Sequence, residues 1–340
     1  MGEYFKYHNV TKDVISEVSL PFNFAMPWAK DLHRYTTEEN KEFFQYVIDN
    51  NDWNDTDKIV AVGDYGTIVD DPRDKEWERI TMYQVDAFTD KPFHGNAAAV
   101  CPLGKWLSDE KMQRIAAENN LSETAFFIQM GDRFHIRWFT PVAEVDLCGH
   151  ATLATAYVIF HEQMYKQENI TFESRSGDLH VSRRDDWFVL DFPNQAGKPC
   201  SPPAQLMDGL GHEPEPVEVL VSTDYMVVYE SESQIRDLKP DFSCLSQLDL
   251  RGVIITAPGD EVDFVSRFFV PQYGINEDPV TGSAHCILTP YWAEKLDKTS
   301  LTARQLSQRG GELQCELKDD RVLIAGKAVK YMEAQIILRR

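Results

Sequence analysis

The chain has 340 residues, and 43% of them are hydrophobic, which is typical of a folded globular protein. This length predicts two or three domains of ordinary size. The formal net charge of −21 argues against nucleic acid or an anionic membrane as the main partner, because an acidic surface is repelled by both.

The sequence predicts neither a membrane segment nor an oxidised protein. No apolar run approaches the length of a membrane span, and the N-terminal residues lack the apolar stretch of a secretory signal. No two of the six cysteines form a C-x-x-C pair, so reduced thiols are expected. We therefore expect a cytoplasmic protein that does not bind membranes.

Residues 1–78 form an N-terminal extension whose pattern differs from that of the remaining chain. A capping box at Thr36–Glu39 and the apolar residues that follow it at helical spacing predict a helix. Residues 58–62 and 65–69 flank a Gly-Asp pair, which predicts a β-hairpin. The charged stretch 70–76 is the expected linker. The extension is predicted to be a small α+β unit, and its role is unknown.

From residue 79 the pattern changes to short strands with occasional helices. Strands are predicted at 80–88, 123–129 and 134–139, and near Thr171, Leu179 and Phe188. Ser108 is the expected N-cap of a helix that runs through Asn119. The stretch from Gly149 to about Glu162 is almost entirely apolar, which predicts a helix buried on all sides.

The second half repeats this plan. Strands are predicted at 217–221, 226–229, 253–256, 263–270, 313–316, 321–324 and 332–338. The second apolar helix is predicted from Ser283 to about Lys295. Each half is therefore predicted to be an antiparallel sheet around one apolar helix, which is an α+β fold.

Two stretches 130 residues apart resemble each other. Arg137–Pro141 and Arg267–Pro271 share an Arg-aromatic-Phe-x-Pro pattern, and each is followed by an acidic loop and then by the glycine that opens an apolar helix, Gly149 or Gly282. A duplication of this kind predicts two similar lobes that face each other. Two helix N-termini in one cleft would bind an anion, since each offers unpaired backbone N–H groups and a partial positive charge. A small carboxylate substrate is the first hypothesis.

Glu123 is a candidate general acid or base. It stands at the entry to the apolar strand Glu123–Gln129, where partial burial of a carboxylate suits proton transfer near neutral pH. The alternative interpretation is a solvated glutamate at the end of a strand.

His150 and Asp278 lie beside the two helix starts, and we expect them to approach each other if the lobes face each other. The alternative for His150 is a helix-terminal histidine without a special role. The repeat argues against it, because a polar group stands beside both helix starts. Glu277 is predicted to be a solvated loop residue.

Other chemistries have weaker support. Cys148 precedes Gly149, but Thr281 occupies the matching place in the second copy, so a pair of thiols is absent and Cys148 is predicted to be structural. The sequence contains no glycine-rich phosphate loop, no nucleophile elbow and no histidine spacing for a metal. We predict a reaction without cofactor or metal.

The sequence resembles the PhzF-like family of phenazine biosynthesis, which has the diaminopimelate-epimerase fold. The motifs that carry the resemblance occur in the family's order: 85–89, 93–100, 122–126, 137–141, 148–152 and 277–284. Together they cover about residues 81–340. Ala97 stands where many relatives carry proline, and residues 1–78 fall outside the resemblance.

The resemblance implies two pseudo-symmetric lobes, each an antiparallel near-barrel around a central helix, with the active site between them. It also implies that the final strand returns to the first lobe. The expected domains are the extension 1–78, a first lobe at 79–196 with the closing strand 330–340, and a second lobe at 197–329.

The resemblance also implies roles for individual residues. The family's proton-moving glutamate corresponds to Glu123, and the assisting histidine and aspartate correspond to His150 and Asp278. The implied substrate-binding residues are Asn96, Gly149, Ala151, Gly282 and Ser283. Diaminopimelate epimerases and proline racemases use two cysteines instead, and Thr281 argues against such a two-thiol reaction here.

We therefore expect a cofactor-independent isomerase or epimerase that moves a proton on a small anionic carboxylate, with Glu123 as the general acid or base. Either His150 or Asp278 relays the proton. A homodimer is expected. The alternative is a non-catalytic ligand-binding or interaction protein on an inherited isomerase scaffold, and a hydrolase has less support because no nucleophile elbow is present.

Overall fold

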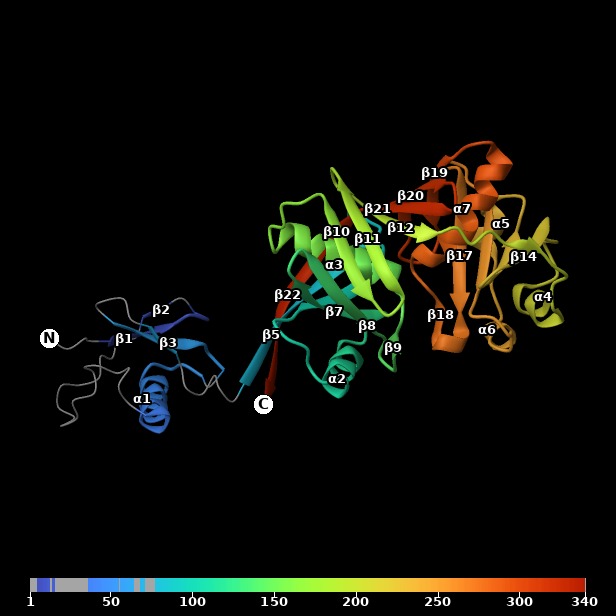
Figure 1. Ribbon diagram of the computed structural model, residues 1–340. Coiled ribbons are helices and arrows are strands. Elements are labelled where there is room, and N and C mark those ends of the chain that lie inside the picture. The colour runs from blue at the N-terminus through green and yellow to red at the C-terminus, as the bar shows by residue number, and fades with distance from the viewer. Residues whose placement is uncertain are drawn as a thin grey trace, which may run out of the picture. The chain divides into compact units, whose positions relative to one another are not determined.

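The computed structural model divides the chain into two compact units. The described residues are 5–12, 14–15, 36–54, 56–63, 68–70 and 77–339. One unit consists of Met1–Ile80 with Gln335–Arg340, and the other consists of Thr81–Ala334. Figure 1 labels the elements of both units.

The first unit is a four-stranded sheet with one helix. The strands are β1 (Phe5–Asn9), β2 (Val14–Ile15), β3 (Ile59–Gly63) and β4 (Ile68–Asp70), in the order β2-β1-β3-β4. Helix α1 (Thr37–Asn50) begins at the predicted capping box, where the Thr36 hydroxyl accepts from the Glu39 N–H and the Glu39 carboxylate accepts from the Thr36 N–H. Phe44 and Val47 of this helix are buried in one cluster with Tyr7.

Sequence analysis predicted part of this sheet. Strands β3 and β4 pair antiparallel, as the predicted hairpin requires. Gly63 of the predicted turn belongs to β3, whereas residue 64, residues 65–67 of the predicted second strand and the linker residues 71–76 lie outside the described residues. Strands β1 and β2 were not predicted, because five and two residues are too short for a hydrophobic pattern to be recognised.

The second unit contains two lobes, and its first and last strands extend beyond it, since residues 77–80 and 335–339 belong to the first unit. The first lobe contains β5 (Trp77–Ala87), β6 (Asn96–Pro102), α2 (Asp109–Asn119), β7 (Glu123–Met130), β8 (Arg133–Phe139), β9 (Glu144–Val145), α3 (Gly149–His161), β10 (Asn169–Ser174), β11 (Gly177–Arg184) and β12 (Trp187–Pro193). The second contains β13 (Lys198–Pro199), α4 (Ala204–Leu210), β14 (Glu218–Val221), β15 (Tyr225–Val228), α5 (Glu232–Asp237), α6 (Phe242–Leu245), β16 (Val253–Pro258), β17 (Phe264–Val270), β18 (Ile275–Glu277), α7 (Gly282–Leu296), β19 (Ser300–Gln305), β20 (Gly311–Lys318) and β21 (Arg321–Gly326). The last strand is β22 (Ala328–Arg339).

The two lobes repeat the same strand pairings. The pairs β7–β8, β8–β9, β8–β10 and β10–β11 of the first lobe match β16–β17, β17–β18, β17–β19 and β19–β20 of the second. In equivalent places, Thr124 pairs with Phe139 and Val253 pairs with Phe269. The duplication that the sequence predicts is therefore present in the strand register.

The sheet differs from the prediction in one respect. Strands β5 to β22 form one 18-stranded sheet that runs through both lobes, and it is mixed rather than purely antiparallel. The parallel pairs are β6–β7, β8–β10, β15–β16 and β17–β19. In the sequence, helices lie between the two strands of each parallel pair. Parallel strands require such a crossover connection, because the chain must return before it can run in its original direction again.

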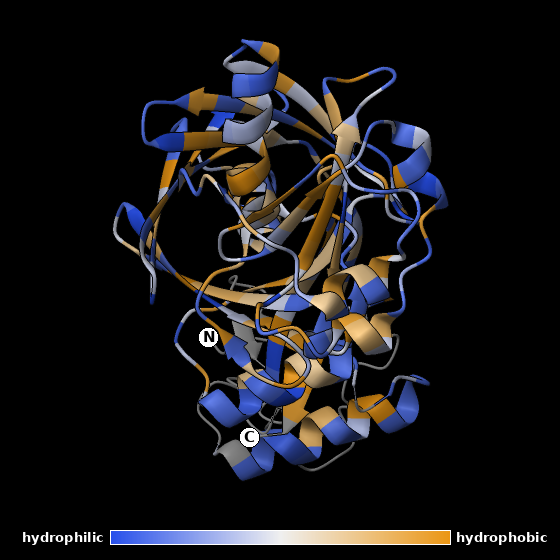
Figure 2. Cartoon of the chain, turned by 90° about the vertical axis from the view of Figure 1, so that its right-hand side faces the viewer, coloured by the Kyte–Doolittle hydropathy of each residue, from blue (hydrophilic) through white to orange (hydrophobic). Residues whose placement is uncertain are grey.

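Each lobe encloses one buried helix, as predicted. Nearly all residues of α3, among them Leu153 and Ile159, are buried, and so are Ile287 and Leu288 of α7. Figure 2 shows apolar residues along the strands and inner helices of the chain, with polar residues on the loops. Among the described residues, no helix is long and apolar enough to cross a membrane.

The lobes are joined through the sheet. Strands β12 and β21 pair antiparallel, with Leu190 opposite Ile324. Strand β22 then lies beside β5, so the chain returns to the first lobe after the second is complete. The junction therefore holds the N-terminal ends of α3 and α7 in a fixed relation.

Candidate active site

The N-termini of α3 and α7 meet where the lobes join. A Cβ added to Gly149, the first residue of α3, would lie 3.6 Å from the Cα of Gly282, the first residue of α7. Neither N-cap residue, Cys148 or Thr281, makes a side-chain capping bond, and neither first turn contains an acidic residue. The backbone N–H groups of both first turns therefore suit an anion.

Asn96, the first residue of β6, connects the two lobes at this point. Its side-chain nitrogen lies 2.8 Å from Oδ1 of Asp278, 3.0 Å from the carbonyl oxygen of Val280 and 3.3 Å from Nδ1 of His150. Asn96 is completely buried. His150 and Asp278, which belong to opposite lobes, thus come together around one amide.

Glu123 and His150 form the second contact of the site. Glu123 is the first residue of β7, and its Oε2 lies 3.1 Å from Nε2 of His150. Neither of these two buried atoms makes a well-directed hydrogen bond with a described residue. Burial opposes a charge on His150, but the adjacent Glu123 carboxylate favours the charge, and the pKa of His150 is raised above its ordinary value.

Cys148 lies on the other side of the imidazole. Its Sγ is 3.5 Å from Nδ1 of His150, and burial raises the pKa of the Cys148 thiol to about 11. The sulfur is therefore protonated at neutral pH, and Glu123 is the anion that favours a charged His150. Glu123, Cys148 and His150 also place one potential metal-ligand atom each within 4.8 Å. Glu123 and Cys148 contact different nitrogens of the His150 ring, however, so no single ring nitrogen faces both of these side chains.

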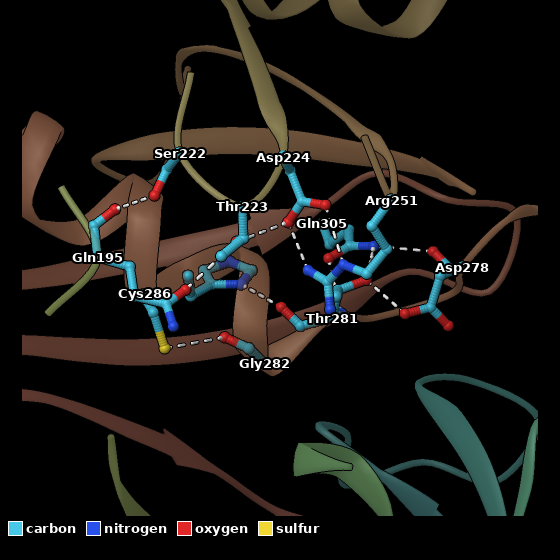
Figure 3. Close-up of polar contacts among 11 residues, drawn as sticks. Gln195, Ser222, Thr223, Asp224, Arg251, Asp278, Thr281, Gly282, Cys286 and Gln305 are labelled. Carbon is cyan, nitrogen blue, oxygen red and sulfur yellow. Dashed lines mark hydrogen bonds and ion pairs between the residues drawn. The ribbon is translucent and has the colours of Figure 1, made fainter. Parts of the chain in front are cut away.

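Asp278 is held by residues that the sequence analysis did not assign to the site. Its Oδ2 accepts a hydrogen bond from the Thr281 hydroxyl, and its backbone carbonyl accepts one of 2.8 Å from Nε2 of Gln305 (Figure 3). Gln305 also accepts from the Thr281 N–H at 2.9 Å. Burial raises the pKa of Asp278 to about 6. Thr281, which the sequence marks only as a missing thiol, thus fixes the carboxyl group.

The remaining predicted substrate-binding residues lie in the two first turns. Ala151 of α3 is completely buried, whereas Ser283 of α7 is half-buried. The Ser283 side chain makes no hydrogen bond to any residue in the described ranges. Ser283 and the adjacent backbone N–H groups can therefore contact a ligand at the junction of the lobes.

The arginines of the sequence repeat have a structural role. Nε and Nη2 of Arg137 donate to both oxygens of Glu144, at 2.7 and 2.8 Å, and those of Arg267 donate to both oxygens of Glu277, at 2.8 and 2.9 Å. The prediction that Glu277 is a solvated loop residue is therefore wrong, since its side chain is only 21% exposed and is paired across β17 and β18. Each ion pair anchors the segment that leads to α3 or α7.

Comparison with known proteins gives consistent matches over this unit. The model of a family described as phenazine biosynthesis-like protein matches residues 85–334. Two relatives from Pseudomonas aeruginosa, each named an uncharacterized isomerase, are 51% and 53% identical over 259 and 261 residues, which is 76% of this chain and 99% of each relative.

The fold is also found in solved structures. The crystal structure of a PhzF family phenazine biosynthesis protein from Enterococcus faecalis is 46% identical, with a TM-score of 0.74 over 76% of this chain and 99% of that one. This similarity confirms the predicted fold of two lobes around central helices. The residues before 85 lie outside the family match.

Proposed function

The chain belongs to the phenazine biosynthesis-like (PhzC-PhzF) family, and from this premise we propose that it is an isomerase that moves a proton on a small carboxylate. The isomerase class is supported by the relatives at 51% and 53% identity that carry this name. The chain covers 99% of those relatives, so the site lies within the shared part. Proton transfer by side chains alone, without a cofactor, is part of the proposal.

The contact between Glu123 and His150 carries the proposal. A buried carboxylate oxygen can take a proton from carbon, and a charged imidazole whose ring nitrogen lies 3.1 Å away stabilises the carboxylate before the transfer and can pass on its own proton as it receives the new one. Glu123 removes the proton, and His150 relays it or stabilises the charge that develops. Asp278 accepts one hydrogen bond on each oxygen, from Asn96 and from Thr281, and we assign it the role of a positioning residue.

The substrate carboxylate is proposed to bind at the first turns of α3 and α7. The N–H groups following Gly149 and Gly282 have no side-chain caps, and Ser283 adds a hydroxyl group. Hydrogen-bond donors that are already oriented stabilise the enolate-like charge that forms when an adjacent carbon loses its proton. A buried site strengthens these interactions because water is excluded.

The second lobe has no equivalent of Glu123. Because Phe139 and Phe269 match in the sequence repeat, Thr124 is equivalent to Val253, and Glu123 to Gly252. A Cβ at Gly252 would lie 2.7 Å from a ring carbon of Phe268, so the packing leaves no space for a side chain there. A single base acts on one face of the substrate, which favours transfer of a proton between two carbons over racemisation by two opposed bases.

Deuterium incorporation tests this function. Wild type, Glu123→Gln and Cys148→Ser are incubated in D₂O with a panel of unsaturated small carboxylic acids, and C–D formation is read by mass spectrometry. Glu123→Gln keeps the size of the side chain but cannot accept a proton, so incorporation should fall at least 100-fold, as expected for the loss of a general base. Cys148→Ser should retain most of it. Glu118→Gln, on the exposed face of α2, is the matched control and should equal wild type.

Two outcomes would contradict the proposal. Incorporation that survives in Glu123→Gln but is lost in Cys148→Ser would assign the proton to sulfur. Binding of carboxylates by wild type without any incorporation would favour the alternative of a non-catalytic ligand-binding protein.

A further inference from the structure

Arg251 occupies a special position in the second lobe. It precedes Gly252, which is the equivalent of Glu123, and therefore stands at the same end of β16 as the base does of β7. In the first lobe, this end of the strand lies beside the N-terminus of α3. By the same pseudo-symmetry, Arg251 lies near the N-terminus of α7.

The electrostatic surroundings of Arg251 agree with this placement. Burial opposes the charge of Arg251, but Asp224 outweighs it, and the more remote Tyr273 and Asp278 also favour the charge, so the pKa of Arg251 is raised. Arg251 is therefore within electrostatic reach of Asp278 at the junction of the lobes. Figure 3 shows its guanidinium between Asp224 on one side and Thr281 on the other.

Asp224 fixes the orientation of the guanidinium. The Asp224 side chain is completely buried, and its two oxygens accept from Nε, at 2.9 Å, and from Nη2. The cationic carbon of Arg251 also lies 5.3 Å from the centre of the Phe268 ring. A guanidinium with its Nε–Nη2 edge held in this way cannot rotate freely, so its remaining donors have a defined direction.

The other edge of the guanidinium is available for a ligand. Nη1 makes no hydrogen bond to any residue that the structure describes, and 36% of the side chain is exposed. The Nη1–Nη2 edge of a guanidinium matches the two oxygens of a carboxylate. Because the chain has a net charge of −21, an additional anionic group on a ligand would need an oriented cation close to it in order to bind.

We propose that Arg251 is a specificity-determining residue that binds a second carboxylate of the substrate, so that the substrate class is a small dicarboxylate. This inference rests on the proposed function, because the first carboxylate is assigned to the helix N-termini. One carboxylate lies at the N-termini of α3 and α7, and the other pairs with the free edge of Arg251. The carbon that loses its proton lies between them, facing Glu123.

Crotonate and glutaconate provide a matched pair of probes, since glutaconate is crotonate with a second carboxylate on its terminal carbon. Binding to the full chain is measured by titration calorimetry. Wild type should bind glutaconate at least tenfold more tightly than crotonate. Arg251→Gln alone would leave Asp224 buried without its partner and could unfold the lobe. The double variant Asp224→Asn/Arg251→Gln is therefore the test, and it should lose the preference while crotonate affinity stays unchanged.

The double variant Glu232→Gln/Arg236→Gln is the matched control, because Glu232 is likewise buried and paired with an arginine of the same lobe. It should keep the preference for glutaconate. A preference that survives in Asp224→Asn/Arg251→Gln, or wild type that binds both acids equally, would overturn the role of Arg251 and leave the proposed function standing. Wild type that binds neither acid would count against the carboxylate substrate itself and so against both proposals.

Discussion

The side-chain amide of Asn96, in the first lobe, donates a hydrogen bond of 2.8 Å to Oδ1 of Asp278, in the second. The same nitrogen lies 3.0 Å from the carbonyl oxygen of Val280. One completely buried residue therefore holds the segment before α7 against the start of β6. This connection is what brings His150 and Asp278 into one site.

Replacing Asn96 by alanine should lower the free energy of unfolding by about 2–3 kcal/mol, because buried acceptors on Asp278 and Val280 lose their donor. Urea denaturation of the full chain measures the change. Asn169→Ala, at an exposed position of β10, is the control and should change stability by less than about 0.5 kcal/mol. Equal effects of the two substitutions would show that the interlobe bond contributes nothing.

The raised pKa of Asp278 predicts a dependence of stability on pH. Burial raises the pKa of this carboxyl from 3.8 to about 6, so the folded state favours the protonated form. The contribution is fully present below about pH 4 and is lost as the pH rises through 6. The shift corresponds to about 3 kcal/mol. Asp278→Asn should not show this loss.

The measurement is the difference in unfolding free energy between wild type and Asp278→Asn at pH 4, 5, 6 and 7. Taking the difference removes the opposite trend from His285, whose pKa burial lowers to about 4 and whose contribution is lost as the pH falls. Wild type should lose stability relative to the variant between pH 4 and 7. A difference that stays constant would show that Asp278 has an ordinary pKa.

The ion pairs of the sequence repeat should contribute much more to the stability of the folded protein than ion pairs on the surface do. Arg267→Met leaves the Glu277 carboxylate without its partner and also removes the donor to the carbonyls of Ile235 and Leu238, at 3.1 and 2.8 Å. The expected loss of stability is about 3 kcal/mol. Arg114→Met removes an exposed pair with Glu110 and should cost less than about 0.5 kcal/mol. Thermal and urea unfolding of both variants would test this, and similar losses would contradict it.

Whether a feature could be predicted from the sequence alone depends on how far apart in the chain its interacting residues lie. The two buried helices and the approach of His150 to Asp278 were predictable, because long apolar stretches and a repeated motif are visible along the chain. The place of Glu123 in the same site was implied only by the family resemblance. The roles of Thr281 and Gln305 were not. Gln305 reaches the loop before α7 only because β19 pairs in parallel with β17, and no local pattern announces such a pairing.

The same limit applies to the pair of Asp224 and Arg251, which are far apart in the sequence and meet through the parallel pair β15–β16. Helices α4, α5 and α6 were missed for a different reason. They have seven, six and four residues, which is too few for a helical period to be recognised. Glu277 was misjudged because its partner Arg267 lies on another strand.

The protonation state of Cys148 distinguishes proton transfer by the Glu123 carboxylate from proton transfer by sulfur. With a pKa raised to about 11 by burial, Cys148 should be alkylated slowly by iodoacetamide at pH 8, and the rate should rise about tenfold for each pH unit until about pH 11. Glu123 contributes to this raised pKa, so Glu123→Gln should speed the alkylation of Cys148 at pH 8. Peptide mass spectrometry follows each site separately, with the partly exposed Cys200 as an internal reference.

If Cys148 reacted at pH 8 as fast as Cys200, or if Glu123→Gln left its rate unchanged, the thiol would not be the neutral neighbour of His150 that its raised pKa indicates. A thiolate beside His150 would then compete with Glu123 for the proton of the imidazole. Slow alkylation in wild type together with faster alkylation in Glu123→Gln would instead show that the Glu123 charge keeps the sulfur protonated, which leaves the carboxylate as the basic group beside His150.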